Sequence, residues 1–381
     1  MRYYCLTSSL KLLNCNKNVL ISINVRNLSA TAQTNGDKVK ATPAPPPTET
    51  SDGDNNNTQQ QRSLHIAVIG APNVGKSTFI NNIINHRVCP TSAKVHTTRK
   101  SNTAIWTIGQ TQLVFYDTPG LVTQREIRKH HLDQSFKSAC RHAIQHSDIV
   151  AVVQDASNSW TRRELHPTVL DTLKAYAKLP SFLILNKIDA LKSKRVLLDL
   201  IKTLTNDTLQ GRRQGKKLPP KDAVQQLEVG TPLSQRETSW SHFNDVFLVS
   251  ALTGNGLQEL QDYLIGAAKP RRWQYAGDVY TDATPEALIV ESVRARLLDY
   301  LPQEIPYNLK CKMEYYNVEK HVVYTSVLVQ CPTPRIERLI CGESNGKLRQ
   351  ITERVTSDLV EMFGQAVSLT ISTVSDGKKT A

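Results

Sequence analysis

The chain has 381 residues, of which 39% are hydrophobic and 21% charged, and its 47 lysine and arginine residues outnumber its 34 aspartate and glutamate residues by 13. This length predicts roughly two to three domains, and no apolar run approaches the roughly 18 residues of a membrane helix, which argues against an integral membrane protein. The seven cysteines form no C-x-x-C pair, which argues against a disulfide-built secreted domain and a zinc ribbon.

The first 36 residues contain four basic residues and no acidic residue. This composition is typical of a mitochondrial transit peptide, and residues 26–29 resemble a site for the matrix protease, with cleavage after Leu28. A cytosolic tail is the alternative. The following stretch, rich in Pro, Asn, Gln and Thr, has the composition of a linker. We therefore predict a transit peptide at 1–28, a linker at 29–63 and the mitochondrial matrix as the location.

Folded structure is expected to begin at Leu64. Short apolar runs predict buried strands, and helical patterns alternate with them. The predicted strands are 64–70, 112–116, 149–154, 182–185 and 246–249, and the predicted helices are 76–86, 124–146, 162–178 and 256–267. Such alternation predicts an α/β domain, here 64–270, with a mostly parallel sheet and helices on both faces. Nine basic residues against two acidic ones in 192–221 indicate a basic, partly disordered insert at about 192–240.

The pattern changes near Lys269 and Pro270. After a predicted linker at 271–285, the order is helix, two strands, short helix, longer helix and strand, and it predicts a smaller α+β domain at 286–381. The expected elements are 286–301, 308–317, 321–330, 334–340, 346–362 and 366–374.

A phosphate-binding loop is the strongest motif. Residues 70–77 match G-x-x-x-x-G-K-[ST] and lie between a predicted strand and a predicted helix, where backbone N–H groups can surround phosphate oxygens. Lys76 would reach the β- and γ-phosphates, and the Ser77 hydroxyl would bind Mg²⁺. The residues predicted to bind nucleotide here are Gly70, Ala71, Pro72, Asn73, Val74, Gly75, Lys76, Ser77 and Thr78.

Three further motifs each follow a predicted strand, and the last two of them predict recognition of guanine. Asp117 would hold Mg²⁺ through water, and Gly120 leaves its N–H free for the γ-phosphate. The Asp189 carboxylate can accept hydrogen bonds from guanine N1–H and the exocyclic amine, a donor pair that adenine lacks. Ser250 and its successors could present N–H groups to guanine O6. The predicted residues are Asp117, Thr118, Pro119, Gly120, Asn186, Lys187, Asp189, Ser250, Ala251 and Leu252.

Together these motifs make residues 64–381 resemble the translation-factor-like GTPases, and among them the Era-type GTPases. The resemblance implies binding and hydrolysis of GTP with Mg²⁺, and it assigns Thr98 to switch I as the threonine that completes the Mg²⁺ site. Thr97 is the alternative. The resemblance also allows a potassium ion held by Asn73 against the phosphates. Catalysis would then rest on Lys76, Thr98 and Gly120.

The residue after D-x-x-G is Leu121, where Ras-like enzymes carry the glutamine that orients the attacking water. A leucine side chain forms no hydrogen bond, so we expect slow intrinsic hydrolysis, with water positioned by backbone, a cation or a partner. Alternatively, Leu121 is simply a residue of the hydrophobic core, which is compatible with slow hydrolysis.

The C-terminal order resembles a type II KH domain, which clamps about four single-stranded nucleotides with a G-x-x-G loop. Asn345 stands at the second glycine and is the residue that best tolerates left-handed φ, whereas Glu343 adds an unhelpful negative charge. A KH fold kept for protein contacts is the alternative. The predicted RNA-binding residues are Ile340, Gly342, Glu343, Ser344, Asn345, Gly346, Lys347, Leu348 and Arg349.

The resemblance implies a GTP-dependent switch that binds mitochondrial small-subunit ribosomal RNA and assists assembly of the small ribosomal subunit. We expect the protein to be a monomer. Two alternatives stay open. One is a GTP-dependent scaffold whose KH-like domain contacts proteins. The other is a G protein at the inner membrane, whose basic insert would contact acidic lipid.

Overall fold

The computed structural model describes residues 60–92, 94, 102–123, 135–208, 238–302 and 305–375, although the side chains of 135–137 are not among them. The predicted transit peptide and the predicted switch I residues Thr97 and Thr98 lie outside this part of the chain. No helix within it is both long and apolar enough to cross a membrane.

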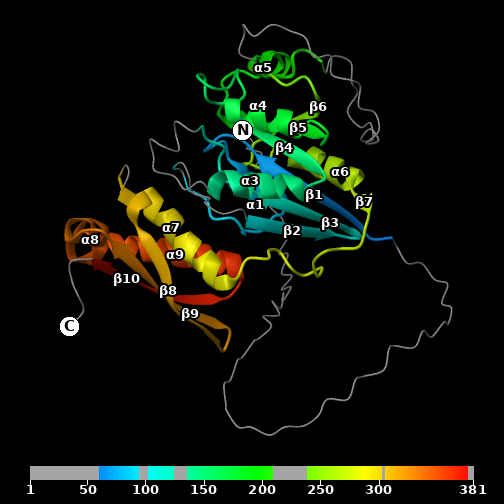
Figure 1. The fold of residues 1–381 in the computed structure, drawn as a ribbon. Coiled ribbons are helices and arrows are strands. Elements are labelled where there is room, and N and C mark those ends of the chain that lie inside the picture. The colour runs from blue at the N-terminus through cyan, green and yellow to red at the C-terminus, as the bar shows by residue number, and fades with distance from the viewer. Residues whose placement is uncertain are drawn as a thin grey trace, which may run out of the picture. The chain divides into compact units, whose positions relative to one another are not determined.

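A seven-stranded sheet forms the first domain, and its β-strands run in the order β2-β3-β1-β4-β5-β6 (Figure 1). Neighbouring strands are parallel except β2, which is antiparallel to β3, and the short β7, which is antiparallel to β1. The predicted mostly parallel sheet is therefore confirmed, whereas β2 was not predicted. The strands are β1 (Arg62–Ile69), β2 (Asn102–Ile108), β3 (Thr111–Asp117), β4 (Ile149–Asp155), β5 (Ser181–Asn186), β6 (Phe243–Leu248) and β7 (Lys269–Pro270).

Helices cover both faces of this sheet. Side chains alternate along a strand, so Leu64 and Ile66 of β1 lie in one buried cluster, whereas Ala67 and Ile69 lie in a second cluster on the opposite face. One cluster packs against α1 (Lys76–Ile83) and α6 (Leu257–Ala267). The other packs against α3 (Ser135–Gln145), α4 (Pro167–Ala175) and α5 (Arg195–Thr205), and a 3₁₀ turn at Ile188–Ala190 follows β5.

Helix α5 lies inside the range for which composition predicts an insert. Leu197, Leu200 and Leu204 recur at helical spacing and are buried against the sheet, whereas Arg195 and Lys202 stay exposed. The basic residues thus occupy the outer face of a core helix. Residues 209–237 of the predicted insert lie outside the described residues.

The C-terminal domain has the predicted α-β-β-α-α-β order. Its three-stranded sheet runs β10-β9-β8, with β10 parallel and β8 antiparallel to β9. Three helices share one buried cluster with this sheet, and Val327 and Val329 of β9 are completely buried there. The elements are α7 (Pro285–Tyr300), a 3₁₀ turn (Ile305–Asn308), β8 (Lys310–Glu319), β9 (Val322–Cys331), α8 (Pro334–Cys341), a second 3₁₀ turn (Glu343–Asn345), α9 (Gly346–Phe363) and β10 (Ala366–Ser375).

The predicted linker between the two domains is bound to the first sheet. We call residues 271–283 the strap. The N–H of Ile105 in β2 donates to the carbonyl of Tyr280 at 2.8 Å. The fully buried side chain of Gln112 donates to the Tyr275 carbonyl at 2.9 Å and accepts from the N–H groups of Gln274 and Tyr275 at 3.1 Å. The strap therefore belongs structurally to the first domain, and the free connection to α7 is only a few residues long.

Replacing Gln112 by leucine should loosen the strap. Leucine fills the space but leaves strap backbone groups without partners, and each unsatisfied group costs about 1–3 kcal/mol. We expect the free energy of unfolding to fall by about 2 kcal/mol and proteolysis within 271–283 to accelerate. Gln110→Leu is the control, because the Gln110 side chain is exposed. Equal denaturation midpoints for the two variants would contradict this role.

Candidate functional site

The phosphate-binding loop connects β1 to α1, as predicted. Gly75, which precedes α1, has a φ of 95°. Lys76 opens the helix with its side chain almost completely buried, and its ammonium donates to the carbonyls of Gly70 at 3.2 Å and Ala71 at 3.0 Å. A Cβ on Gly120 would lie 2.8 Å from the Cα of Pro72, so only glycine allows the segment after β3 to approach this loop. The loop is thus a narrow cradle around a buried cation.

Burial lowers the pKa of Lys76 to about 8, against a smaller upward influence of Asp117. Desolvation disfavours the charged form of an amine, so the buried ammonium carries its charge at an energetic penalty. An incoming polyphosphate would relieve that penalty by supplying the missing negative charge. The site is therefore built for an anion.

Oxygen donors suitable for Mg²⁺ lie next to this lysine. The Ser77 hydroxyl donates to Oδ2 of Asp117 at 2.6 Å, and Asp117 is fully buried at the end of β3. The next residue, Thr118, donates to the carbonyl of Val68 at 2.7 Å and so fixes the segment that follows β3. A serine hydroxyl and a carboxylate are hard oxygen ligands of the kind that Mg²⁺ takes beside phosphates, so these residues fit the ion.

Asn186 and Lys187 brace the phosphate-binding loop from β5. The Asn186 amide donates to the Val74 carbonyl at 2.9 Å and accepts from the Ala251 N–H at 2.9 Å. A Cβ on Gly75 would lie 2.5 Å from this amide nitrogen. The Lys187 ammonium donates to the Asn73 carbonyl at 2.7 Å. The predicted phosphate and guanine motifs therefore form one hydrogen-bonded unit.

Asp155 contacts the predicted site, although it belongs to none of the motifs. Its carboxylate accepts from the Lys187 ammonium at 2.7 Å and from the Ser157 hydroxyl at 2.6 Å. Burial pushes the pKa of Asp155 upward, but these hydrogen bonds outweigh burial and lower it overall. The available signal was an acidic residue at the carboxyl end of β4, next to the strand that carries Asn186. Asp155 thus holds Lys187 in place over the loop.

Asp189, the carboxylate predicted to select guanine, is held from the loop after β6. The Ser250 hydroxyl donates to Oδ1 of Asp189 at 2.5 Å, while the Asp189 residue itself remains exposed. Ser250 is fully buried and Leu252 is largely exposed. The arrangement orients a carboxylate toward solvent and leaves it accessible to a base.

An open cleft lies over the phosphate-binding loop. It adds three residues that the motifs did not identify, Pro90, Thr91 and Ser92. The remaining lining residues are Pro72, Asn73, Gly75, Lys76, Ser77, Thr78 and Gly120. The predicted phosphate-contacting residues thus lie together, and Thr98, which lies outside the described residues, stays a prediction.

Leu121 belongs to the hydrophobic core. Its side chain is buried in the cluster that contains Cys140 and Ile144, and its N–H donates to the Gly70 carbonyl at 3.0 Å. The side chain at this position therefore cannot orient a water molecule in the cleft.

The predicted RNA-binding loop joins α8 to α9. Asn345 adopts a left-handed φ of 60°, as expected for the residue at the second glycine position, and Ser344 is also left-handed. Glu343 and Arg349 are exposed, and Lys347 and Leu348 are half-buried. Ile340 is completely buried and so supports the loop from the core. The Arg349 side chain forms an ion pair with Glu353 at 2.9 Å.

The pKa of Lys76 predicts proton uptake on binding of Mg²⁺·GDP. Near pH 7 the free lysine is mostly charged, whereas at pH 8.5 a group with a pKa of about 8 is roughly three-quarters neutral. Polyphosphate binding favours the charged form, so uptake should be small at pH 7 and rise toward roughly 0.75 proton at pH 8.5. Calorimetry in buffers of different ionisation enthalpy measures it. Equal uptake at both pH values would contradict the assignment.

Comparisons with known proteins all find GTPases. Residues 65–187 match a family model described as a 50S ribosome-binding GTPase. The chain is 32% identical over 334 residues to the mitochondrial GTPase Era of Danio rerio, covering 82% of this chain and 75% of that protein. It is 29% identical over 360 residues to the mitochondrial GTPase Era of Caenorhabditis elegans, covering 83% of this chain and 91% of that protein. A crystal structure of Era with MgGDPNP and nucleotides 1506–1542 of 16S ribosomal RNA superposes with a TM-score of 0.64 and 21% identity, covering 83% of this chain and 95% of that one.

Proposed function

Because the chain belongs to the Era family of GTPases, we propose that it acts in mitochondria as a switch that binds RNA of the small ribosomal subunit and assists assembly of that subunit. Three observations support this proposal. The relatives from Danio rerio and Caenorhabditis elegans are named mitochondrial. The acid-free leader has a transit-peptide composition. The solved Era complex contains ribosomal RNA.

The observation that carries the nucleotide assignment is the unit formed by Asn186, Lys187 and the phosphate-binding loop. It holds the guanine-selecting Asp189 in fixed relation to Lys76, because both motifs share hydrogen bonds. Ser77 would bind Mg²⁺ directly, and Asp117 through water. The bound ion would neutralise charge on the phosphates during hydrolysis. Potassium at Asn73 remains a further part of the proposal.

Hydrolysis of GTP to GDP and phosphate has little help from side chains in this cleft. Lys76 supplies positive charge at the phosphates, and Gly120 supplies a backbone N–H. Leu121 is committed to the core, so positioning of the water falls to backbone, a cation or the RNA-bound state. Intrinsic hydrolysis should therefore be slow, with Thr98 proposed to complete the Mg²⁺ site.

We assign the RNA contact to the loop 342–345 and the first turn of α9. The loop is exposed at its tip, and the following turn offers N–H groups as well as Lys347 and Arg349. These groups would bind the RNA backbone, whereas Glu343 weakens the attraction. The expected ligand is a single-stranded segment of about four nucleotides.

Sequencing of RNA crosslinked to the protein in cells, in its GTP-locked form, tests this proposal. We expect enrichment of mitochondrial small-subunit ribosomal RNA. Binding of the same RNA segment in vitro should weaken in a Lys347→Ala/Arg349→Ala variant, and its salt slope should fall by about 0.7 for each lost phosphate contact. Lys312→Ala is the control, because it removes an exposed charge from strand β8 of the same domain.

Recovery of proteins without RNA would contradict the proposal and favour the scaffold function. An unchanged salt slope in the Lys347→Ala/Arg349→Ala variant would show that the protein binds RNA at a site other than this loop.

A further inference from the structure

One loop of the first domain presents a tryptophan ring to solvent. Residues 156–166, which we call the Trp160 loop, connect β4 to α4. The Trp160 side chain is 93% exposed, the highest value for any large hydrophobic side chain among the described residues. Tryptophan is enriched at interfaces, because its large apolar ring gains most when a partner covers it. The nucleotide site does not use this ring, so Trp160 indicates a separate contact.

Hydrogen bonds hold the Trp160 loop in shape. The buried side chain of Gln154, at the end of β4, donates to the Thr161 carbonyl at 2.9 Å. Within the loop, the Asn158 side chain accepts from the N–H of Trp160 at 3.0 Å. The Asn158 carbonyl accepts from the N–H of Arg162, also at 3.0 Å. The backbone that carries Trp160 is therefore braced, and a ligand can bind the ring without first ordering the loop.

Basic residues accompany the ring. The loop carries two arginines against one acidic residue, Glu164. Arg163 is exposed and Arg162 is half-buried, and within the described part of the chain neither guanidinium pairs with a carboxylate. From this loop to the end of α5, seven exposed basic residues outnumber four exposed acidic ones. This charge favours an anionic occupant, and the fork of an arginine side chain matches a phosphate group.

The neighbours of Trp160 distinguish between anionic occupants. Asn158, Ser159 and Thr161 are polar and exposed, so they add no apolar surface to the ring. A membrane surface is bound through the apolar area that it buries, and a protein interface has an apolar core. A nucleobase needs only a flat ring to stack on and a cation near its phosphate. Single-stranded nucleic acid is therefore the occupant that fits a lone tryptophan beside two arginines.

We propose that the Trp160 loop is a second RNA-binding site, located on the GTPase domain, in which Trp160 stacks on an unpaired base and Arg163 binds a neighbouring phosphate. This inference rests on the proposed RNA-binding function. The site is separate from the loop 342–345 of the C-terminal domain. Two linked sites on one RNA strand bind more tightly than either site alone.

Binding of the full-length chain to mitochondrial small-subunit ribosomal RNA, transcribed in vitro, tests this site. We expect Trp160→Ala to raise the dissociation constant about tenfold, because the stacked base loses its aromatic partner. Trp160→Tyr keeps a ring and should stay within about threefold of the unchanged protein. Arg163→Gln should lower the salt slope by about 0.7, the value for one lost phosphate contact with a single strand.

The matched control is Leu198→Ala. Leu198 is 65% exposed on α5 of the same domain and has no ring on which a base can stack. Its replacement should leave the RNA affinity unchanged. Thermal unfolding and the affinity for Mg²⁺·GDP identify any variant that fails to fold.

Tryptophan fluorescence supplies a readout that is specific to this ring. Of the four tryptophans in the chain, Trp160 alone is exposed. Stacking of a base should quench its emission, so RNA should quench the unchanged protein and have little effect on Trp160→Phe.

Equal RNA affinity in the unchanged protein and Trp160→Ala, with equal quenching in Trp160→Phe, would overturn the site. A blue shift of Trp160 emission with vesicles of phosphatidylcholine and phosphatidylglycerol, without quenching by RNA, would overturn it in favour of a membrane contact. Loss of a co-purifying protein from Trp160→Ala at unchanged RNA affinity would overturn it in favour of a protein contact. If the unchanged protein does not bind the RNA, the proposed function fails instead, so the two failures are distinguishable.

Discussion

Replacing Asp189 by asparagine should lower the affinity for GTP by about 100-fold or more and transfer the preference to xanthosine triphosphate. The carboxylate would accept both donors of the guanine edge, and a site built around such donors strongly rejects a ligand that lacks them. Xanthine has an oxygen where guanine has its amine, and the asparagine amide can donate to that oxygen. Ser250, which donates to Asp189 at 2.5 Å, should hold the amide oxygen in the same way.

Competition against a fluorescent guanine nucleotide measures this exchange, with GTP, xanthosine triphosphate and ATP as competitors. Asp199→Asn is the control, because it removes an exposed carboxylate from the nearby helix α5. An unaltered order of preference in Asp189→Asn would refute the assignment of guanine recognition to this residue.

Replacing Lys76 by methionine should lower the affinity for GDP and GTP by about 100-fold or more, because losing one partner of a buried charge pair costs about 2–5 kcal/mol. Methionine has nearly the length of the lysine stem, so the loop should retain its backbone path. Titration with a fluorescent nucleotide measures the loss. Affinity within threefold of the unchanged protein would contradict the role of the buried ammonium.

The same substitution should stabilise the nucleotide-free protein at pH 7. Burial lowers the pKa of Lys76 to about 8 from an ordinary value of 10.5, which corresponds to a penalty of about 3 kcal/mol in the folded state. The two hydrogen bonds to carbonyls offset about 2 kcal/mol of it, so a gain of about 1 kcal/mol is expected.

The sign of this effect depends on pH. The penalty is fully present below pH 8, where the buried lysine must carry its charge, and it disappears as the pH rises toward 10.5, where the unfolded chain also loses the proton. Denaturation at pH 7 and pH 10 should therefore show the advantage of methionine at the lower pH only. Destabilisation at pH 7 would show that the hydrogen bonds outweigh burial.

The sequence predicts the parts of this protein that depend on local patterns. The motif residues from Gly70 to Ser77 imply a strand, a loop and a helix, and the structure has all three. The C-terminal elements agree with the predicted order to within about two residues at most ends, as is usual for strongly patterned segments. Asn345 adopts the left-handed conformation that its side chain favours.

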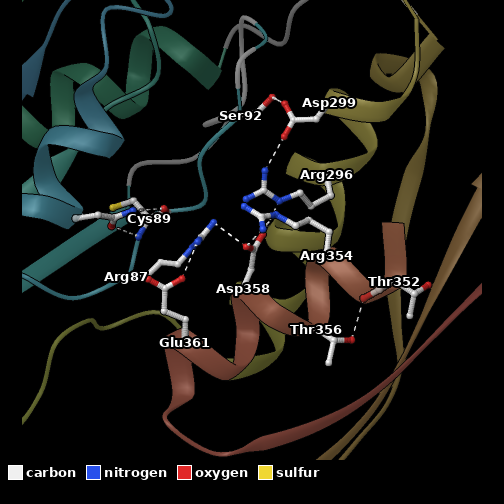
Figure 2. A network of polar contacts seen from close by, with 11 residues as sticks. Arg87, Cys89, Ser92, Arg296, Asp299, Thr352, Arg354, Thr356, Asp358 and Glu361 are labelled. Atoms are coloured by element: carbon white, nitrogen blue, oxygen red, sulfur yellow. Dashed lines mark hydrogen bonds and ion pairs between the residues drawn. The ribbon is translucent and has the colours of Figure 1, made fainter. Parts of the chain in front are cut away.

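The parts that were missed depend on contacts between distant residues. Strand β2 is antiparallel to β3 at the edge of the sheet and carries Thr and Asn among its apolar residues, so its pattern is weak. The basic residues of α5 led to the prediction of an insert, whereas the helical spacing of its three buried leucines indicates a core helix. Asp155 forms an ion pair with Lys187, and Arg87 forms one with Asp358 (Figure 2). The partners of each pair are far apart in the sequence, and no spacing rule indicates such pairs.

The central claim is that one hydrogen-bonded unit, running from Lys76 through Asn186 to Asp189, binds a triphosphate and selects its base. The most direct test is competition between GTP and ATP for the unchanged protein in the presence of Mg²⁺, with a fluorescent GDP as the reporter. We expect GTP to displace the reporter and a thousandfold excess of ATP to leave it bound. Equal displacement by ATP, or failure of the protein to bind the reporter, would contradict the account.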